Sequence, residues 1–87
     1  MNLDRDAVKA AIRNQVVELA KNLGHTVTEL GDDDIIPATG YLDSAAVLEL
    51  VVWYENAYDL SLSQDEINID NLGSVNAMTD YLLKRKA

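Results

Sequence analysis

Ser44 is the residue of this sequence whose position could support chemistry, because it follows Asp43 and precedes an apolar helical pattern. A serine hydroxyl is a weak nucleophile unless a neighbouring base activates it. The sequence contains one histidine, His25, and no feature of the pattern brings it to Ser44. A hydrolytic triad is therefore disfavoured. Ser44 is either a helix-capping residue or the substrate of a modifying enzyme.

The start of a helix is a favourable place for an attached phosphate group. The first turn offers free backbone N–H groups and the positive end of the helix dipole. Asp43 has the residue type and position of a cap, and its carboxylate could help a modifying enzyme to hold a metal ion or a basic group. We therefore predict that Ser44 suits covalent attachment of a phosphate-linked group better than catalysis by the protein itself.

An apolar strip is predicted directly below Ser44. At 100° per residue, one flank of the helix carries Ser44, Leu48, Val52 and Glu55. Leu48 and Val52 lie beside the main core stripe and next to the acidic Glu49 and Glu55. A hydroxyl above an apolar strip bordered by carboxylates is typical of a docking surface for a partner protein. The alternative is that Leu48 and Val52 pack under the preceding loop.

Four segments have the pattern of helices, and the segment between the first two does not. Apolar residues at spacings of three and four predict the long helices and their core-facing stripes. The stripes are Val8, Ile12, Val16, Leu19, Ala20 and Leu23 in the first helix, Val47, Leu50, Val51, Tyr54 and Tyr58 in the second, and Val75, Met78 and Leu82 in the last. Ser63 and Glu66 have capping-box spacing, which predicts a short helix, and Ser74 is a suitable cap for the last one. We predict a single domain, residues 1–87, with an all-α fold: a four-helix bundle of three main helices and one short helix. The predicted helices are about 4–23, 44–58, 64–69 and 75–85, with a long loop at 24–43. We expect Ile35 and Ile36 to pack against the core and to hold this loop in place.

The charge is strongly and unevenly acidic. The net charge is −8, and no Lys or Arg occurs between Lys21 and Lys84. Such a segment repels phosphate backbones and anionic lipids, so we expect no nucleic-acid and no membrane partner. It would attract partner proteins that carry basic patches. Simple solubility of a small domain is the alternative explanation.

The composition excludes several classes of site. The absence of cysteine rules out disulfides, thiolate metal ligands and a cysteine nucleophile. The run Asp32–Asp34 lacks the alternating spacing of a calcium-binding loop, so no metal site is predicted. No apolar run is long enough to span a membrane, and the charged start is unlike a signal peptide. We expect a soluble, cytoplasmic monomer.

From Asp43 onward the sequence resembles acyl carrier proteins and peptidyl (aminoacyl) carrier proteins. The stretch "DSAAVLELVVWYENAYDLSLSQDEI" is similar to the Asp-Ser segment of that family, with acids at Glu49 and Glu55. The stretch "DNLGSVNAMTDYL" is similar to the start of the family's last helix. The order of helix, long loop, "LDS" helix, short helix and final helix extends the resemblance over most of the chain.

The resemblance implies a carrier with no catalytic activity of its own. Ser44 would hold a covalent 4′-phosphopantetheine arm, attached by a phosphopantetheinyl transferase, with Asp43 positioning the hydroxyl. The thiol of the arm would carry an acyl or aminoacyl group as a thioester. The expected partners are an adenylating ligase and downstream acyl-transferring enzymes. Leu48, Glu49, Val52 and Glu55 are the residues predicted to recognise them.

Two residues depart from the commonest family pattern. Ala45 stands where leucine is usual, and Ala46 stands where an acid is frequent. These departures argue against fatty-acid-synthesis enzymes as partners. The pattern "LDS…VLELV…E" more closely resembles free-standing carriers that work with a dedicated adenylating ligase, including D-alanyl and other aminoacyl carriers. The alternative from another class is an acidic helical adaptor without a prosthetic group, in which Ser44 is only a cap.

Overall fold

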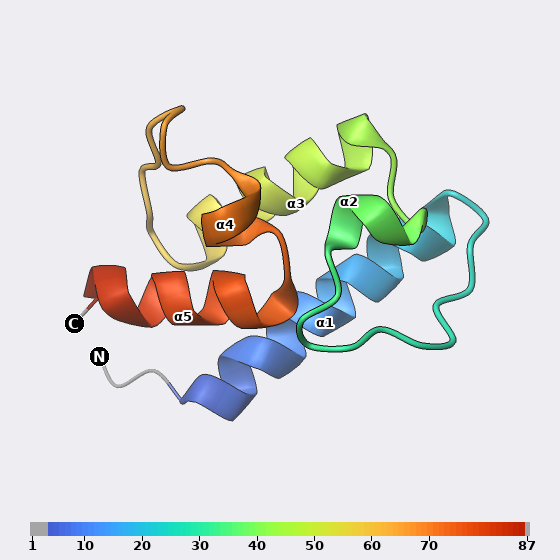
Figure 1. Cartoon of the computed structure of the whole chain (residues 1–87), viewed down its shortest axis with the longest axis horizontal. Coiled ribbons are helices and arrows are strands. Elements are labelled where there is room, and N and C mark those ends of the chain that lie inside the picture. Colours follow the sequence, from blue (N-terminus) through green and yellow to red (C-terminus); the bar gives the residue numbers. More distant parts are fainter. Residues whose placement is uncertain (1–3, 87) are drawn as a thin grey trace.

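Five helices make up the regular structure of this computed structural model, which describes residues 4–86. They are α1 (Arg5–Asn22), α2 (Ile36–Thr39), α3 (Ser44–Ala57), α4 (Ile69–Leu72) and α5 (Val75–Lys86). The described residues contain no strand, so the prediction of an all-α fold is confirmed. Helix α1 packs against both α3 and α5, while α2 packs on α3 and α4 on α5. The α1–α2 and α3–α4 connections lie at opposite ends of the molecule (Figure 1).

The core is almost entirely aliphatic, with Tyr54 as its largest fully buried side chain. The predicted stripes of the three long helices form it, although Leu23 of the first stripe is 41% exposed. Ala46, which was not part of any predicted stripe, is buried. The buried residues of the long helices are Val8, Ile12, Val16, Leu19 and Ala20 of α1, Ala46, Leu50, Val51 and Tyr54 of α3, and Val75, Met78, Thr79 and Leu82 of α5.

Side-chain caps explain where the long helices begin. The carboxylate of Asp4 accepts a hydrogen bond from the backbone N–H of Asp6 ahead of α1. The hydroxyl oxygen of Ser74 accepts one from the N–H of Ala77, 3.0 Å away, ahead of α5. After α1, Gly24 adopts φ of +83°, a conformation that favours glycine and ends the helix. The bounds of α1, α3 and α5 therefore fall within one residue of those predicted.

The predicted helix at 64–69 is wrong. Ser63 and Glu66 do make the side-chain contact of a capping box, because the Glu66 carboxylate accepts hydrogen bonds from the N–H and hydroxyl of Ser63. Residues 64–66 form only a turn, and the backbone of Asn68 is extended. The side chain of Asn68 instead caps a later helix, α4, by accepting from the N–H of Asn71 at 2.8 Å.

The predicted loop 24–43 contains one helical turn, α2, which starts with Ile36 and Pro37. Ile36 is buried, as expected, but Ile35 is 39% exposed, which contradicts the expectation that both pack on the core. The N–H of Ile36 donates to the carbonyl of Gly73 at 2.8 Å, so α2 is fastened to the junction of α4 and α5. No helix in the described part of the chain is long and apolar enough to cross a membrane.

Candidate functional site

Ser44 is the first residue of α3, and its side chain is exposed to solvent. The cap of this helix is Asp43, whose carboxylate accepts a hydrogen bond from the N–H of Ala46 at 2.8 Å. The carbonyl of Asp43 accepts from the N–H of Val47 at 2.9 Å and so begins the helical hydrogen-bond series. Because Asp43 caps the helix, the hydroxyl of Ser44 is not required for that purpose.

Replacing Asp43 with alanine is expected to lower the free energy of unfolding by about 1 kcal/mol, because the N–H of Ala46 loses its partner. Urea unfolding followed by circular dichroism measures the loss. Asp43→Asn is the control, since an asparagine side-chain oxygen can accept the same hydrogen bond. Equal losses for both variants would show that the carboxylate acts through its charge rather than as a cap.

An open groove of about 590 Å³ lies against Ser44, between α2 and the first turn of α3. Its lining is mainly apolar and comprises Pro37, Leu42, Asp43, Ser44, Val47 and Leu48. A second cavity, of about 160 Å³, adjoins it between α3 and α4 and shares Pro37 and Val47 with it. The other residues that line this α3–α4 cavity are Val51, Ile67, Asn68, Ile69, Leu72 and Gly73. Apolar surface therefore continues from Ser44 to α4.

The predicted apolar strip is on the surface. Leu48 is 61% exposed and Val52 is 54% exposed, so neither is covered by the long loop, which excludes that alternative. Glu49 is exposed beside them. Glu55 is half-buried, and its carboxylate accepts a hydrogen bond from the N–H of Leu62 at 3.1 Å. Glu55 therefore has a structural contact besides any role in recognition.

Three acids of the acidic segment are paired with cations from the ends of the chain. Asp32 contacts Lys9 and Arg13, Asp80 contacts Arg5, and Glu66 contacts Arg85. The hydrogen bond from Lys9 is the largest cause that lowers the pKa of Asp32. Helix α3 contains no Lys or Arg, so the negative charge of Glu49 and Glu55 has no cation on its own helix. The apolar strip is therefore bordered by two carboxylates that no cation of α3 compensates.

The remaining candidate residues do not form a reactive cluster. His25 is exposed after the end of α1, where its backbone N–H donates to the carbonyl of Ala20. Within residues 4–86, no three acidic or histidine side chains are arranged to hold a metal ion. The hydroxyl of Tyr41, two residues before the Asp-Ser pair, donates to the carbonyl of Glu29 at 3.2 Å, which joins the two ends of the long loop.

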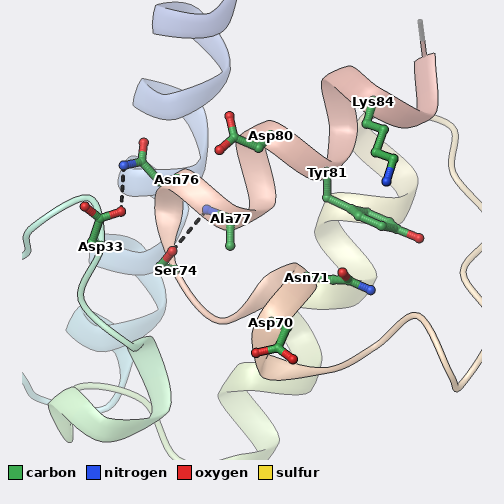
Figure 2. Close-up of a pocket in the computed structure, with 9 residues that line it drawn as sticks. All are labelled: Asp33, Asp70, Asn71, Ser74, Asn76, Ala77, Asp80, Tyr81 and Lys84. Atoms are coloured by element: carbon green, nitrogen blue, oxygen red, sulfur yellow. Dashed lines mark hydrogen bonds between the residues drawn. The ribbon is translucent and has the colours of Figure 1, made fainter.

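A polar groove of about 390 Å³, shown in Figure 2, lies between the acidic loop, α4 and α5. It has no residue in common with the groove at Ser44. Asn76 donates to Asp33 across one end of it, and Tyr81 and Lys84 line the other end. Sequence patterns did not predict this groove, because its lining comes from three segments that are separate in the sequence.

Comparison of the chain with profiles of known protein families, with curated proteins and with solved structures found no match. The assignment of a function therefore depends on the residues at the head of α3 and on their surroundings.

Proposed function

We propose that this protein is an acyl or aminoacyl carrier, with the helix arrangement of acyl carrier proteins and a 4′-phosphopantetheine arm on Ser44. In this interpretation α1, α3 and α5 are the main helices of the bundle, α4 is the short one, and α2 lies in the long loop. The observation that supports it best is that Ser44 is exposed in the first turn of α3 while Asp43 caps the helix.

The residues around Ser44 suit this group. Ser44 and Ala45 place their backbone N–H groups at the positive end of α3, where a phosphodiester is stabilised. Attachment replaces the proton of the Ser44 hydroxyl by a phosphorus–oxygen bond, so the oxygen must be open to a modifying enzyme. The apolar lining at Pro37 and Leu48 offers a surface along which a flexible arm could lie. When bound, the arm supplies a thiol that holds the cargo as a thioester.

Incubation with coenzyme A and a broad-specificity phosphopantetheinyl transferase tests the proposal directly. Intact-mass spectrometry should show the addition of one arm per chain. Peptide mapping should place it on Ser44, the only serine in the first turn of α3. A protein whose mass stays unchanged would contradict the carrier function and favour the adaptor, which binds partners without a prosthetic group.

The same surface is proposed to recognise the transferase, the adenylating ligase and the enzymes that accept the cargo. Their basic patches would meet Glu49 and Glu55, and apolar side chains would meet Leu48 and Val52. In place of the usual leucine and acid, the first turn carries an exposed Ala45 and a buried Ala46. Without a large or charged side chain there, recognition falls to the second turn, which supports a dedicated ligase as the partner.

Glu49→Lys is expected to slow loading by the transferase about tenfold at low ionic strength, because charge reversal removes an attraction that guides encounter. The loss should shrink in high salt, since exposed charges are screened. Glu18→Lys, the same change at an exposed position of α1, is the matched control and should load at nearly the wild-type rate. Similar losses in the two variants would show that net charge alone, rather than this surface, governs encounter.

A further inference from the structure

A second arrangement of side chains, remote in sequence from Ser44, holds the α3–α4 connection in place. The connection, residues 58–68, is fastened to α5 through one carboxylate. Glu66 accepts hydrogen bonds from the hydroxyl of Tyr81 and from the guanidinium of Arg85 with one oxygen. Its other oxygen accepts from the N–H and hydroxyl of Ser63, each at 3.2 Å. Both carboxylate oxygens are thus used, and the side chain is 24% exposed.

The surrounding contacts strengthen this attachment at the end of α5. Arg85 also donates to the carbonyl of Ser61 at 3.3 Å, and Lys86 donates to the carbonyl of Asp59 at 3.1 Å. The last turn of α5 therefore holds the connection at three groups, which are the carbonyls of Asp59 and Ser61 and the carboxylate of Glu66. Of these, only Glu66 offers a charge, so its contacts with Tyr81 and Arg85 are the strongest of the set.

The fastened residue is joined directly to the outer wall of the α3–α4 cavity. That wall begins with Ile67 and Asn68, the next two residues in the chain. The backbone carbonyl of Glu66 accepts from the N–H of Asn68 at 3.1 Å and from the side-chain amide of Asn71 at 3.0 Å. Asn71 belongs to α4, a helix of one turn that depends on such contacts for its position.

We propose that Glu66, Tyr81 and Arg85 form a latch that fixes the outer wall of the α3–α4 cavity, so that opening the latch lets residues 58–72 move, widens the cavity and exposes the buried side chains of Val51 and Leu72. The latch acts on the cavity wall, whatever group Ser44 carries. It also joins the Ser63–Glu66 contact to α5, because Tyr81 and Arg85 bind the second oxygen of the same carboxylate.

Hydrogen exchange tests the latch in the intact chain. In Glu66→Gln, the amides that hold α4, those of Asn71, Leu72 and Gly73, should exchange on the order of tenfold faster. The amides of Ile12 and Val16 in the α1 core should keep their protection, because the opening is local. Unchanged exchange in α4, or equal acceleration in α1, would overturn the proposal.

Because the chain contains no cysteine, one introduced thiol gives a second readout. Val51 lines the cavity and is 6% exposed, so the thiol of Val51→Cys should react with a thiol reagent only when the wall opens. Adding Glu66→Gln should raise its reaction rate on the order of tenfold, whereas Val16→Cys, buried in α1, should be unaffected. Equal rates at Val51→Cys with and without the Glu66 change would contradict the latch.

The three residues should also act as one unit. Tyr81→Phe removes a single hydroxyl and keeps the ring, so it tests the latch even if Glu66→Gln folds poorly. Once Glu66 is replaced, Arg85→Gln should accelerate α4 exchange far less than it does in the wild type. Independent, additive accelerations would show that the contacts are separate surface pairs and would overturn the proposal.

The latch has a defined pH range. The hydrogen bond from Tyr81 is the largest cause that lowers the pKa of Glu66, to about 2, followed by those from Ser63 and Arg85. The ordinary pKa of a glutamate is 4.5, so as the pH falls Glu66 takes up a proton in the unfolded chain before it does so in the folded chain. The stabilisation that the ionised Glu66 gives to the folded chain is complete above about pH 4.5 and disappears as the pH falls towards 2. The difference in α4 exchange between wild type and Glu66→Gln should persist at pH 5 to 7, and its disappearance there would contradict the latch.

Discussion

Ser44→Ala should abolish addition of the phosphopantetheine arm completely while leaving the fold and its stability nearly unchanged. The oxygen that would form the phosphodiester is lost, and no other residue in the first turn of α3 offers a hydroxyl. Folding should tolerate the change because Ser44 is exposed, Asp43 provides the cap, and alanine has the higher helix propensity. Intact mass after treatment with the transferase measures loading, and circular dichroism with urea unfolding measures the fold.

Ser74 provides the matched control, because it too stands at the start of a helix. Its hydroxyl oxygen accepts from the N–H of Ala77, and its side chain is buried at 6% exposure. Ser74→Ala should therefore lower the free energy of unfolding by about 1 kcal/mol and still accept the arm. A loaded Ser44→Ala protein would place the attachment at another serine. A Ser44→Ala protein that unfolds as readily as Ser74→Ala would assign both residues to capping.

Tyr54→Ala should cause the largest loss of stability, about 3–5 kcal/mol, by analogy with other buried aromatic residues. The Tyr54 side chain is fully buried between the long helices, and its ring meets that of Tyr58 edge to face at 5.8 Å. Its hydroxyl donates to the carbonyl of Met78 at 2.7 Å and so joins α3 to α5. Burial raises the pKa of Tyr54 well above its ordinary value, so the hydroxyl remains a donor at all physiological pH values.

Tyr54→Phe separates the ring from the hydroxyl in this prediction. It retains the packing and removes one buried hydrogen bond, so the expected loss is about 1 kcal/mol. Urea denaturation followed by circular dichroism measures both losses. Since domains of this size are stabilised by about 5–15 kcal/mol, Tyr54→Ala should leave a measurable unfolded fraction at room temperature if the wild type lies near the lower limit. Equal effects of the two variants would assign the stabilisation to the hydroxyl alone.

Periodicity and capping residues were enough to predict the long helices, because α1, α3 and α5 each bury a continuous apolar stripe. They were not enough between α3 and α5. The contact of Ser63 with Glu66 is local and has the predicted spacing, but Tyr81 and Arg85 bind the same carboxylate from α5. The short helix begins instead after Asn68, whose side chain caps α4, and this local signal was missed because the capping-box spacing of Ser63 and Glu66 was preferred.

The candidate site, too, was predictable from the sequence only in part. The helix wheel predicted that Leu48 and Val52 lie beside the core stripe, and the structure places both on the surface. Exposure of Ser44 and the capping contact of Asp43 depend only on the first turn of α3, so local sequence was sufficient. The α3–α4 cavity was not predictable, because Pro37, Val51 and Leu72 come together only when α2, α3 and α4 are packed.

The hydrogen bond from Ile36 anchors α2 to Gly73, a residue that also lines the α3–α4 cavity. A Cβ atom on residue 73 would overlap the carbonyl oxygen of Ile69, although the backbone angles of Gly73 are ordinary for any residue. Glycine is thus required there for space rather than for conformation. Any bulkier residue would force residue 73 away from Ile69. Because both residues line the α3–α4 cavity and the carbonyl of Gly73 also holds the first residue of α2, one substitution would distort that cavity and the anchor of α2 together.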